Sequence, residues 1–222
     1  MFIFPVNSHI LITMATQKKP PLRQPQSNPV VVVISGPSGV GKDASIVRIK
    51  ETGARTHYVV TATTRPKRQS EINGVHYHFL TLQQFESGIH HGQFLEYATV
   101  YGNYYGVLRS EVKAALQKGD DVIIKVDVQG AATLKKKIPE AIFIFLLPDS
   151  LTDLANRLKQ RNDDNTSEMD LRLNTAKAEL KQKRWFDYVV VNRLGELDKT
   201  AQKISAIIVA EKCRTKSRNV VL

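Results

Sequence analysis

The chain is poor in cysteine, and its first residues are poor in negative charge. Cys213 is the single cysteine among 222 residues, so no disulfide can form within the chain, and a reducing compartment is favoured. No acidic residue precedes Asp43. The apolar start "MFIFPVNSHILITM" is shorter than the roughly 20 residues of a membrane-spanning helix, and it lacks the basic start of a secretory signal. These shortages exclude a disulfide scaffold and predict no membrane partner.

Residues 1–29 are predicted to be a disordered N-terminal extension. The stretch "ATQKKPPLRQPQSNP" is rich in proline, glutamine and basic residues, a composition that cannot bury a core. Two interpretations of the extension stay open: an organelle-targeting peptide, or a start of the protein at Met14. We expect a cytoplasmic protein, with organelle targeting by this extension as the alternative.

The remaining composition is that of one α/β domain with a polyanionic partner. The hydrophobic fraction of 42% is enough for one domain with a single core. The net charge of +11 suggests a polyanionic partner, either nucleic acid or nucleotide phosphates. The basic C-terminal tail at 211–222, "EKCRTKSRNVVL", has no aromatic residues of the kind that stack on bases. We therefore expect no nucleic-acid partner, and we assign the tail to solubility.

The pattern of apolar runs predicts a parallel sheet flanked by helices. Strands are expected at residues 30–35, 121–130, 141–148 and 187–192, with helical segments between them, beginning with a helix at 42–52. Residues 59–109 alternate short polar strands and turns, which indicates a small inserted mixed-β subdomain. Residues 149–184 are charged and helical and are expected to form a lid. The core would then comprise 30–58, 110–148 and 185–210.

A glycine-rich loop follows the first predicted strand. The stretch "VVVISGPSGVGKD" matches G-x-x-x-x-G-K-[ST], whose backbone and lysine hold nucleotide phosphates, except at its last position. The strand, loop and helix around the motif make a chance match improbable. The candidate nucleotide-binding residues are Gly36, Pro37, Ser38, Gly39, Val40, Gly41, Lys42 and Asp43.

Further motifs give the chain a family resemblance. The segments "GPSGVGK", "TATTRPKR", "NGVHYHF", "FLEYATVYGNYYG" and "DVQG" occur in the order seen in guanylate kinases, across residues 30–210. The chain thus resembles that family. The resemblance implies a P-loop core with a GMP-binding insert and a helical lid, ATP and Mg²⁺ as cofactors, and ATP-dependent phosphorylation of GMP or dGMP in purine metabolism.

The resemblance also assigns residues to the GMP site. Arginine forks bind phosphate oxygens in pairs, and the expected phosphate ligands are Arg65 and Arg68, helped by the hydroxyls of Tyr77 and Tyr105. Guanine presents two adjacent donors that one carboxylate can accept, and Glu96 matches the residue that reads the base. Thr61 and Asp127 complete the expected GMP-binding set.

The lid carries the remaining expected catalytic cations. Arg157 and Arg161 are four residues apart on one predicted helix, which Ser150 and Asp153 would open as a capping box. A second helix, capped by Ser167 and Asp170, carries Arg172. By resemblance these three arginines act with Lys42 on the transferring group, and Asn192 lies near adenine.

Three positions depart from the family pattern. Val107 stands where a serine or threonine usually contacts the base. Asp43 replaces the hydroxyl residue after the loop lysine, and Lys125 replaces a strand aspartate. A charged lysine in a core strand needs a partner, so we expect Lys125 to face Asp43 or the phosphates, and Asp43 to be a candidate Mg²⁺ ligand. The alternative is that Lys125 pairs only with Asp127.

Two other functions compete with GMP phosphorylation. The guanylate-kinase fold also serves as a peptide-binding module without catalysis, but such modules typically lose the loop or lid residues that this chain keeps. A kinase for another nucleotide is disfavoured by Glu96 and Thr61. No obligatory protein partner is expected.

Overall fold

The computed structural model describes residues 28–53, 55–161 and 166–222, with backbone only for residues 160, 161 and 166–170. Most of the predicted extension, and the side chains of Arg161, Ser167 and Asp170, therefore lie outside the described residues. Every helix within the described ranges is too short or too polar to cross a membrane.

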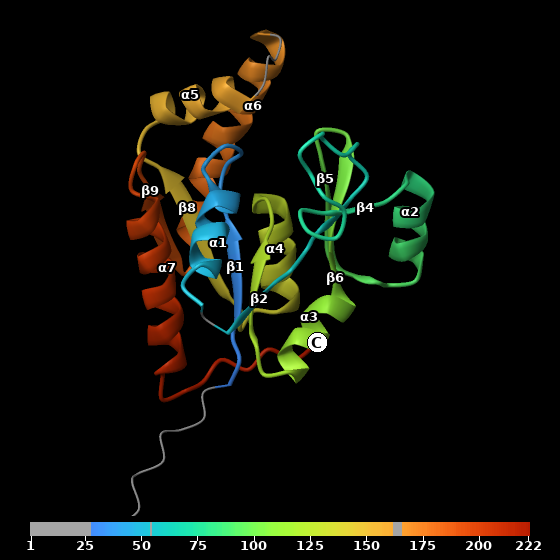
Figure 1. The fold of residues 1–222 in the computed structure, drawn as a ribbon, viewed down its shortest axis with the longest axis vertical. Helices are drawn as coiled ribbons and strands as arrows, with labels where there is room; N and C mark the ends of the chain where they lie inside the picture. Colours follow the sequence, from blue (N-terminus) through green and yellow to red (C-terminus); the bar gives the residue numbers. More distant parts are fainter. Residues whose placement is uncertain (1–27, 54, 162–165) are drawn as a thin grey trace, which may run out of the picture.

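A parallel sheet forms the centre of the molecule (Figure 1). In the described residues it has the order β2-β7-β1-β8-β9, with all pairs parallel. Its strands are β2 (Thr56–Tyr58), β7 (Asp121–Lys125), β1 (Val31–Ser35), β8 (Ile142–Pro148) and β9 (Tyr188–Asn192). The predicted fold class is confirmed: parallel strands buried on both faces need helices on both sides.

Two expectations about these strands were wrong. Four parallel strands were predicted, but β2 adds a fifth at the edge, where Thr56 pairs with Asp121 of β7. With three residues, β2 is too short to show an alternating pattern. The strand predicted at 121–130 ends at Lys125, because the Asp127 side chain accepts a hydrogen bond from the Gly130 N–H and starts α4 (Val128–Lys137).

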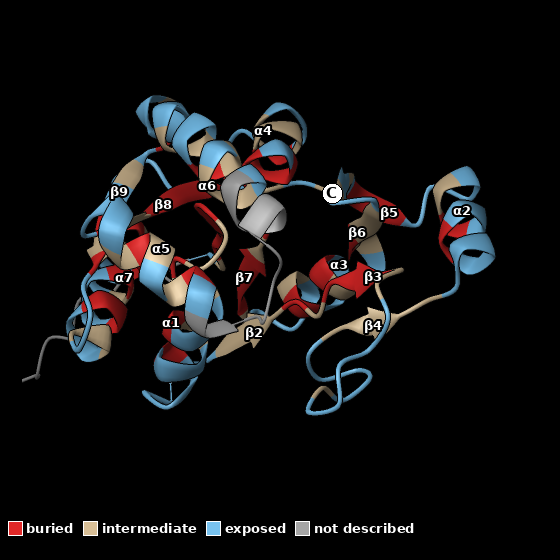
Figure 2. Cartoon of the chain, turned by 90° about the horizontal axis from the view of Figure 1, so that it is seen from above, coloured by how far each residue is buried: buried red, intermediate tan, exposed pale blue. Residues whose placement is uncertain are grey.

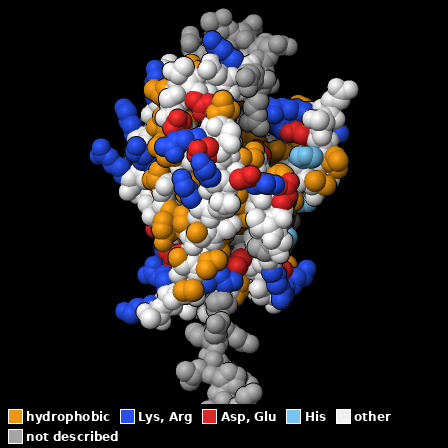
Figure 3. Space-filling view, turned by 60° about the vertical axis from the view of Figure 1, so that its left-hand side comes forward, with side chains coloured by type: hydrophobic (Ala, Val, Ile, Leu, Met, Phe, Trp, Pro, Cys, Tyr) orange, Lys and Arg blue, Asp and Glu red, His pale blue; other side chains and the backbone are white. Residues whose placement is uncertain are grey.

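The core lies on both faces of this sheet. On one face Val31, Val33 and Ile124 pack with residues of α3 (Arg109–Gln117) and α4. On the other, Val32 and Ile34 pack with residues of α1 (Lys42–Lys50) and α7 (Leu197–Lys212). Figure 2 shows buried strands between helices whose outer faces are exposed. The face in Figure 3 carries basic side chains interspersed with acidic and apolar ones.

A second, mixed sheet stands beside the first, as the expected insert requires. Among the described residues its order is β4-β3-β6-β5, with β3–β4 parallel and the other pairs antiparallel. The strands are β3 (Ala62–Thr63), β4 (His78–Phe79), β5 (Phe94–Val100) and β6 (Asn103–Leu108). Helix α2 (Leu82–His90) packs on it and begins with a capping box between Thr81 and Gln84.

The lid helices lie above the end of the parallel sheet where β1 enters its loop (Figure 1). They are α5 (Leu151–Arg161) and α6 (Thr166–Lys181), followed by a 3₁₀ turn, η1 (Gln182–Trp185). Half of the expected capping box is present, because Ser150 Oγ accepts from the Asp153 N–H at 3.0 Å. The Asp153 carboxylate instead pairs with Arg157 at 2.7 Å.

The C-terminal segment is part of the packed structure. Helix α7 runs to Lys212, and Val220 and Leu222 pack against the core. The Glu211 carboxylate, 3% exposed, accepts hydrogen bonds from Arg218 Nε at 2.7 Å and from Tyr188 Oη at 2.5 Å. The expectation that residues 211–222 serve only solubility was therefore wrong, because charges in this segment satisfy a buried acid.

Arg218→Ala should destabilise the protein by roughly 3 kcal/mol at pH 7, because it leaves the Glu211 carboxylate buried without its cation. Hydrogen bonding to Arg218 lowers the pKa of Glu211 to about 2. This stabilisation is present above the unfolded pKa of roughly 4.5 and is lost as the pH falls toward 2. Denaturant unfolding at pH 7 and pH 3 measures it.

Arg214→Ala is the matched control. Arg214 lies 3.4 Å from the same carboxylate, but its side chain is 51% exposed, so a loss below about 1 kcal/mol is expected. Equal losses for the two arginines, or a loss at Arg218 that does not shrink at pH 3, would contradict this role for the C-terminal segment.

Candidate active site

The glycine loop at 36–41 connects β1 to α1, as predicted. Gly36 has φ +142°, and a Cβ there would lie 2.4 Å from the Leu146 carbonyl oxygen, so only glycine fits. Lys42 Nζ donates to the carbonyl oxygens of Gly36 and Pro37 at 2.6 and 3.1 Å. Burial lowers the pKa of Lys42, while Glu179 and Asp43 oppose the shift. The lysine is thus folded over its own loop, at the N-terminus of a helix where anions bind.

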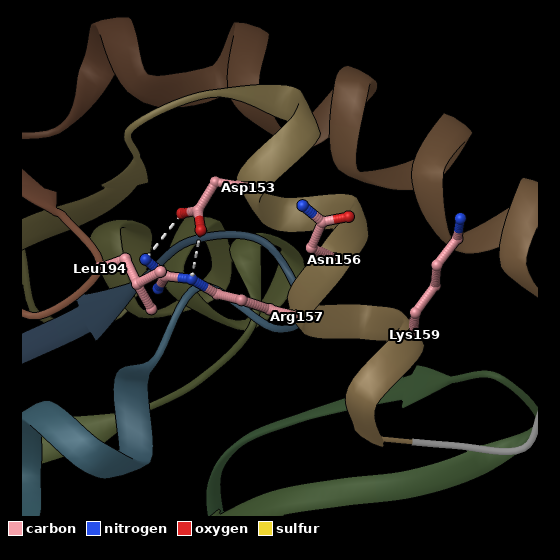
Figure 4. Close-up of a pocket in the computed structure, with 5 residues that line it drawn as sticks. All are labelled: Asp153, Asn156, Arg157, Lys159 and Leu194. Carbon is pink, nitrogen blue, oxygen red and sulfur yellow. Dashed lines mark hydrogen bonds and ion pairs between the residues drawn. The ribbon is translucent and has the colours of Figure 1, made fainter.

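Arg157 fastens the lid to this loop. Its guanidinium donates to the Val40 carbonyl at 3.1 Å and to the Asn192 carbonyl at 2.9 Å, while Asp153 accepts from its other side. Figure 4 shows Asp153 and Arg157 facing each other in a cavity of about 300 Å³, together with Leu194 from the segment after β9. The first lid arginine therefore contacts the loop, and its role in phosphoryl transfer stays a prediction.

Asn192 supports the same loop from β9. Its side-chain amide donates to the Val40 carbonyl at 2.8 Å and accepts from Thr200 Oγ1 at 3.0 Å, and the residue is 3% exposed. A Cβ on Gly41 would lie 2.4 Å from the same amide. Its structural contacts are thus to the loop, and a contact with adenine stays a prediction.

Lys125 lies beside the loop because β7 is the neighbour of β1, with Lys125 in register with Ile34. Its Nζ donates to Asp43 Oδ1 at 2.5 Å and to Tyr77 Oη at 3.1 Å. Burial works to lower the pKa of Lys125, but Asp43 and Tyr77 outweigh it, and the pKa is raised. The predicted contact with Asp43 is confirmed. The alternative that Lys125 pairs only with Asp127 was wrong, because Asp127 caps α4.

The expected phosphate ligands of the insert gather around Tyr77. The Arg65 guanidinium lies 5.5 Å from the Tyr77 ring centroid, and the rings of Tyr77 and Tyr105 are 6.0 Å apart. Arg65 is held by Glu71, at 2.6 Å. The Arg68 side chain is exposed, and its backbone N–H donates to the same Glu71. Three of the four residues are thus brought together.

Glu96 is a buried carboxylate on β5, 2% exposed. It lies directly against α4, where a Cβ on Gly130 would be 2.6 Å from Glu96 Oε1. Burial, with the negative charge of Asp127, raises the pKa of Glu96 to about 8, while Lys137 opposes the shift. Thr61 is also buried, at 5% exposed. A buried acid with a perturbed pKa is a marker of a functional site.

The departure at Val107 has a packing explanation. Val107 is fully buried, pairs with Glu96 across β5 and β6, and belongs to the core cluster on the α4 face. An apolar side chain there adds to the core.

The second lid helix places Arg172 near the insert. Its guanidinium lies 5.7 Å from the Tyr101 ring centroid. The lid and the insert therefore meet around Arg172, while Arg157 lies at the phosphate loop. The side chain of Arg161 is outside the described residues.

Sequence reasoning missed two acidic residues of the site. Glu179 on α6 lies by the loop: burial raises its pKa to about 7 and Asp127 adds to the shift, while Lys42 and the Ser38 backbone N–H oppose it. Glu71 holds Arg65. Both belong to charged stretches that are typical of solvated surface, so no sequence signal marked them.

A glycine loop between the first strand of a parallel sheet and a helix, with a lysine folded over it, defines a P-loop nucleotide-binding protein. Comparison with known proteins narrows this class. The family profile described as "Guanylate kinase" matches residues 27–211. The chain belongs to the guanylate kinase family.

Individual relatives agree with this family. Guanylate kinase 2, chloroplastic/mitochondrial, from Oryza sativa subsp. japonica is 44% identical over 197 residues, 88% of this chain and 69% of the relative. A guanylate kinase from Carboxydothermus hydrogenoformans is 41% identical over 86% of this chain and 92% of its own. The crystal structure of guanylate kinase from Anaplasma phagocytophilum superposes with a TM-score of 0.72 at 30% identity, covering 85% of this chain and 89% of its own.

The titration of Glu96 tests the electrostatics of this site. Carboxyl ¹³C NMR of glutamate-labelled free protein should show Glu96 titrating near pH 8. Asp127→Asn should lower the pKa of Glu96, because it removes a like charge while asparagine still caps α4. Lys137→Met should raise it. A Glu96 pKa near the ordinary value, or no response to either variant, would contradict a buried and coupled carboxylate.

Proposed function

We propose that the protein phosphorylates GMP to GDP with ATP, and that it accepts dGMP as well. The observation that carries the guanine assignment is Glu96, a carboxylate buried at the insert in a chain of the guanylate kinase family. One ionised carboxylate accepts both donors on the edge of guanine, whereas adenine does not present that pair. Burial strengthens this preference, because a mismatched base would leave buried polar groups unpaired.

The chemistry requires positive charge and positioning rather than a general base. The acceptor phosphate is already an oxyanion at neutral pH, and phosphoryl transfer is catalysed chiefly by electrostatic stabilisation and alignment. In our proposal Lys42 and the loop at 36–41 hold the ATP phosphates. Arg65, Arg68, Tyr77 and Tyr105 hold the GMP phosphate, with Thr61 and Asp127 near the base. The lid arginines Arg157, Arg161 and Arg172 close over the group in transfer.

Mg²⁺ is proposed to enter with ATP. Among the described residues no group of three or more His, Cys, Asp or Glu could cage a metal. Kinases instead hold Mg²⁺ through one or two carboxylates and the substrate's phosphates. The Asp43 side chain, 56% exposed beside the loop, fits that arrangement. Asp43 would contribute an oxygen ligand, and the ion would neutralise charge on the β- and γ-phosphates.

The proposal also assigns roles to the insert and the lid, and a compartment to the protein. Residues 59–109 would form the GMP-binding insert and 149–184 the lid, both closing on the core. We propose a role in purine nucleotide metabolism and GMP recycling in the cytoplasm. The chloroplastic/mitochondrial designation of the rice relative keeps an organelle as the alternative for the extension. Nucleic-acid, membrane and obligatory protein partners are not part of the proposal.

The interaction-module alternative has less support. The loop glycines, Lys42 and Arg157 are in place, and the lysine and arginine contact the loop. The relatives described above carry the name guanylate kinase. A peptide-binding module would need neither a P-loop lysine nor a buried Glu96.

A coupled ADP-release assay with ATP, Mg²⁺ and GMP, dGMP, AMP, CMP or UMP tests the proposal. GMP should be the preferred acceptor. In Glu96→Gln the amide accepts one donor of guanine but presents its own NH₂ to the other, so kcat/KM for GMP should fall by about ten- to a hundredfold. Gel filtration and melting confirm that the variant is folded. A preference for AMP, or an unchanged GMP-to-AMP ratio in Glu96→Gln, would contradict the assignment.

A further inference from the structure

Lys125 touches both halves of the site at once. Its Nζ lies 2.5 Å from Asp43 Oδ1 on the loop side and 3.1 Å from Tyr77 Oη on the insert side. The ammonium also lies 4.6 Å from the Tyr77 ring centroid. Asp43 and Tyr77 are 34 positions apart in the chain. Asp43 lies at the start of α1 beside the parallel sheet, and Tyr77 lies just before β4 of the mixed sheet, yet one ammonium reaches both. Lys125 therefore lies at the boundary between the nucleotide loop and the insert.

A second cation converges on the same tyrosine. The Arg65 guanidinium lies 5.5 Å from the Tyr77 ring centroid. Each cation has its own carboxylate: Glu71 for Arg65 at 2.6 Å, and Asp43 for Lys125. Two cations beside one tyrosine, each neutralised by a carboxylate, would suit a multiply charged anion that takes the place of those carboxylates.

Stability does not explain this arrangement. The Lys125 side chain is only 15% exposed, whereas that of Asp43 is 56% exposed. Desolvating the ammonium is costly, and an ion pair with one partner in solvent returns little. An apolar residue at the end of β7 would avoid that cost. The arrangement is, however, well suited to ligand binding, because an anionic ligand could replace the partly exposed Asp43 carboxylate beside the buried Lys125 ammonium.

We propose that Lys125 is a phosphate ligand shared by the two substrates, binding the GMP phosphate and the phosphoryl group as it passes from ATP. Asp43 is its internal counter-ion when the site is empty. In the transfer, the bond from the γ-phosphorus to the oxygen that bridges it to the β-phosphate breaks, and a bond to a GMP phosphate oxygen forms. Lys125 keeps its protons throughout and only neutralises charge. The inference rests on the proposed function.

Isothermal titration of GMP and of guanosine separates a phosphate ligand from a structural residue. In Lys125→Met, GMP binding should weaken by about ten- to a hundredfold, the typical effect of losing a hydrogen bond to a charged group. Guanosine, which lacks the phosphate, should bind within about twofold of the wild type. Lys125→Arg should keep most of the GMP affinity, because it keeps the charge. Melting temperatures confirm folding of each variant.

Lys135→Met is the matched control. Lys135 on α4 pairs with Asp187 at 3.0 Å and lies over the Phe143 ring, away from Asp43 and Tyr77. It changes net charge by the same amount as Lys125→Met. GMP binding to this variant should be unchanged, so any general effect of charge on binding would be visible here.

The double variant Asp43→Asn, Lys125→Met removes both charges of the pair and preserves net charge. The proposal expects GMP binding to remain weakened by at least about fivefold, because the direct contact is missing. Full recovery of GMP affinity in the double variant would mean that Lys125 only neutralises Asp43. Equal losses of GMP and guanosine affinity in Lys125→Met would make Lys125 a structural residue. Either result overturns the inference. Wild-type protein that fails to bind GMP would overturn the proposed function, whereas wild-type-like GMP binding in Lys125→Met overturns the inference alone.

Discussion

The site must gather positive charge for two anions before either anion has arrived. Cations packed together without counter-charge would repel one another and lose solvation. In the described structure each central cation has an internal acceptor: Lys42 the loop carbonyls, Lys125 the carboxylate of Asp43, Arg65 that of Glu71, and Arg157 that of Asp153. In our proposal, the phosphates of the substrates would replace these acceptors when they bind.

The sheet topology makes this preparation possible. The carboxyl ends of parallel strands meet at one edge, so β1 delivers the loop, β7 delivers Lys125 and β9 delivers Asn192 to the same place. The mixed sheet brings Glu96 against Gly130 at the start of α4. Glycine at that position is what allows a carboxylate to be buried there. The free-energy cost of burying the Glu96 carboxylate appears in its raised pKa. A nucleobase that donates two hydrogen bonds to this carboxylate would offset that cost.

Local signals in the sequence predicted the parts that depend on local physics. The strand before the glycine loop, the loop itself and the helix after it were all predicted, and the need of a charged lysine in a core strand for a partner predicted that Lys125 faces Asp43 or the phosphates. The misses have tertiary causes. Strand β2 exists because β7 offers it a partner, and β7 ends early because Asp127 caps a helix. Glu71 and Glu179 contact site residues that are distant or unmarked in sequence, and Arg218 gains its role from burying Glu211.

Asp43 and Lys125 both depart from the family pattern and contact each other, and a double-mutant cycle in kcat/KM tests their coupling most directly. Asp43→Ser should weaken GMP phosphorylation strongly, and Lys125→Asp should nearly abolish it, because two carboxylates would then face the phosphates. The combined Asp43→Ser, Lys125→Asp enzyme should recover a large part of the activity that Lys125→Asp alone loses, because only one carboxylate then faces the phosphates, but it should stay below the wild type in kcat and in GMP affinity because the Lys125 contact is missing. If the losses of the two single variants simply add in the double variant, the two residues act independently, and the proposed coupling between Asp43 and Lys125 is contradicted.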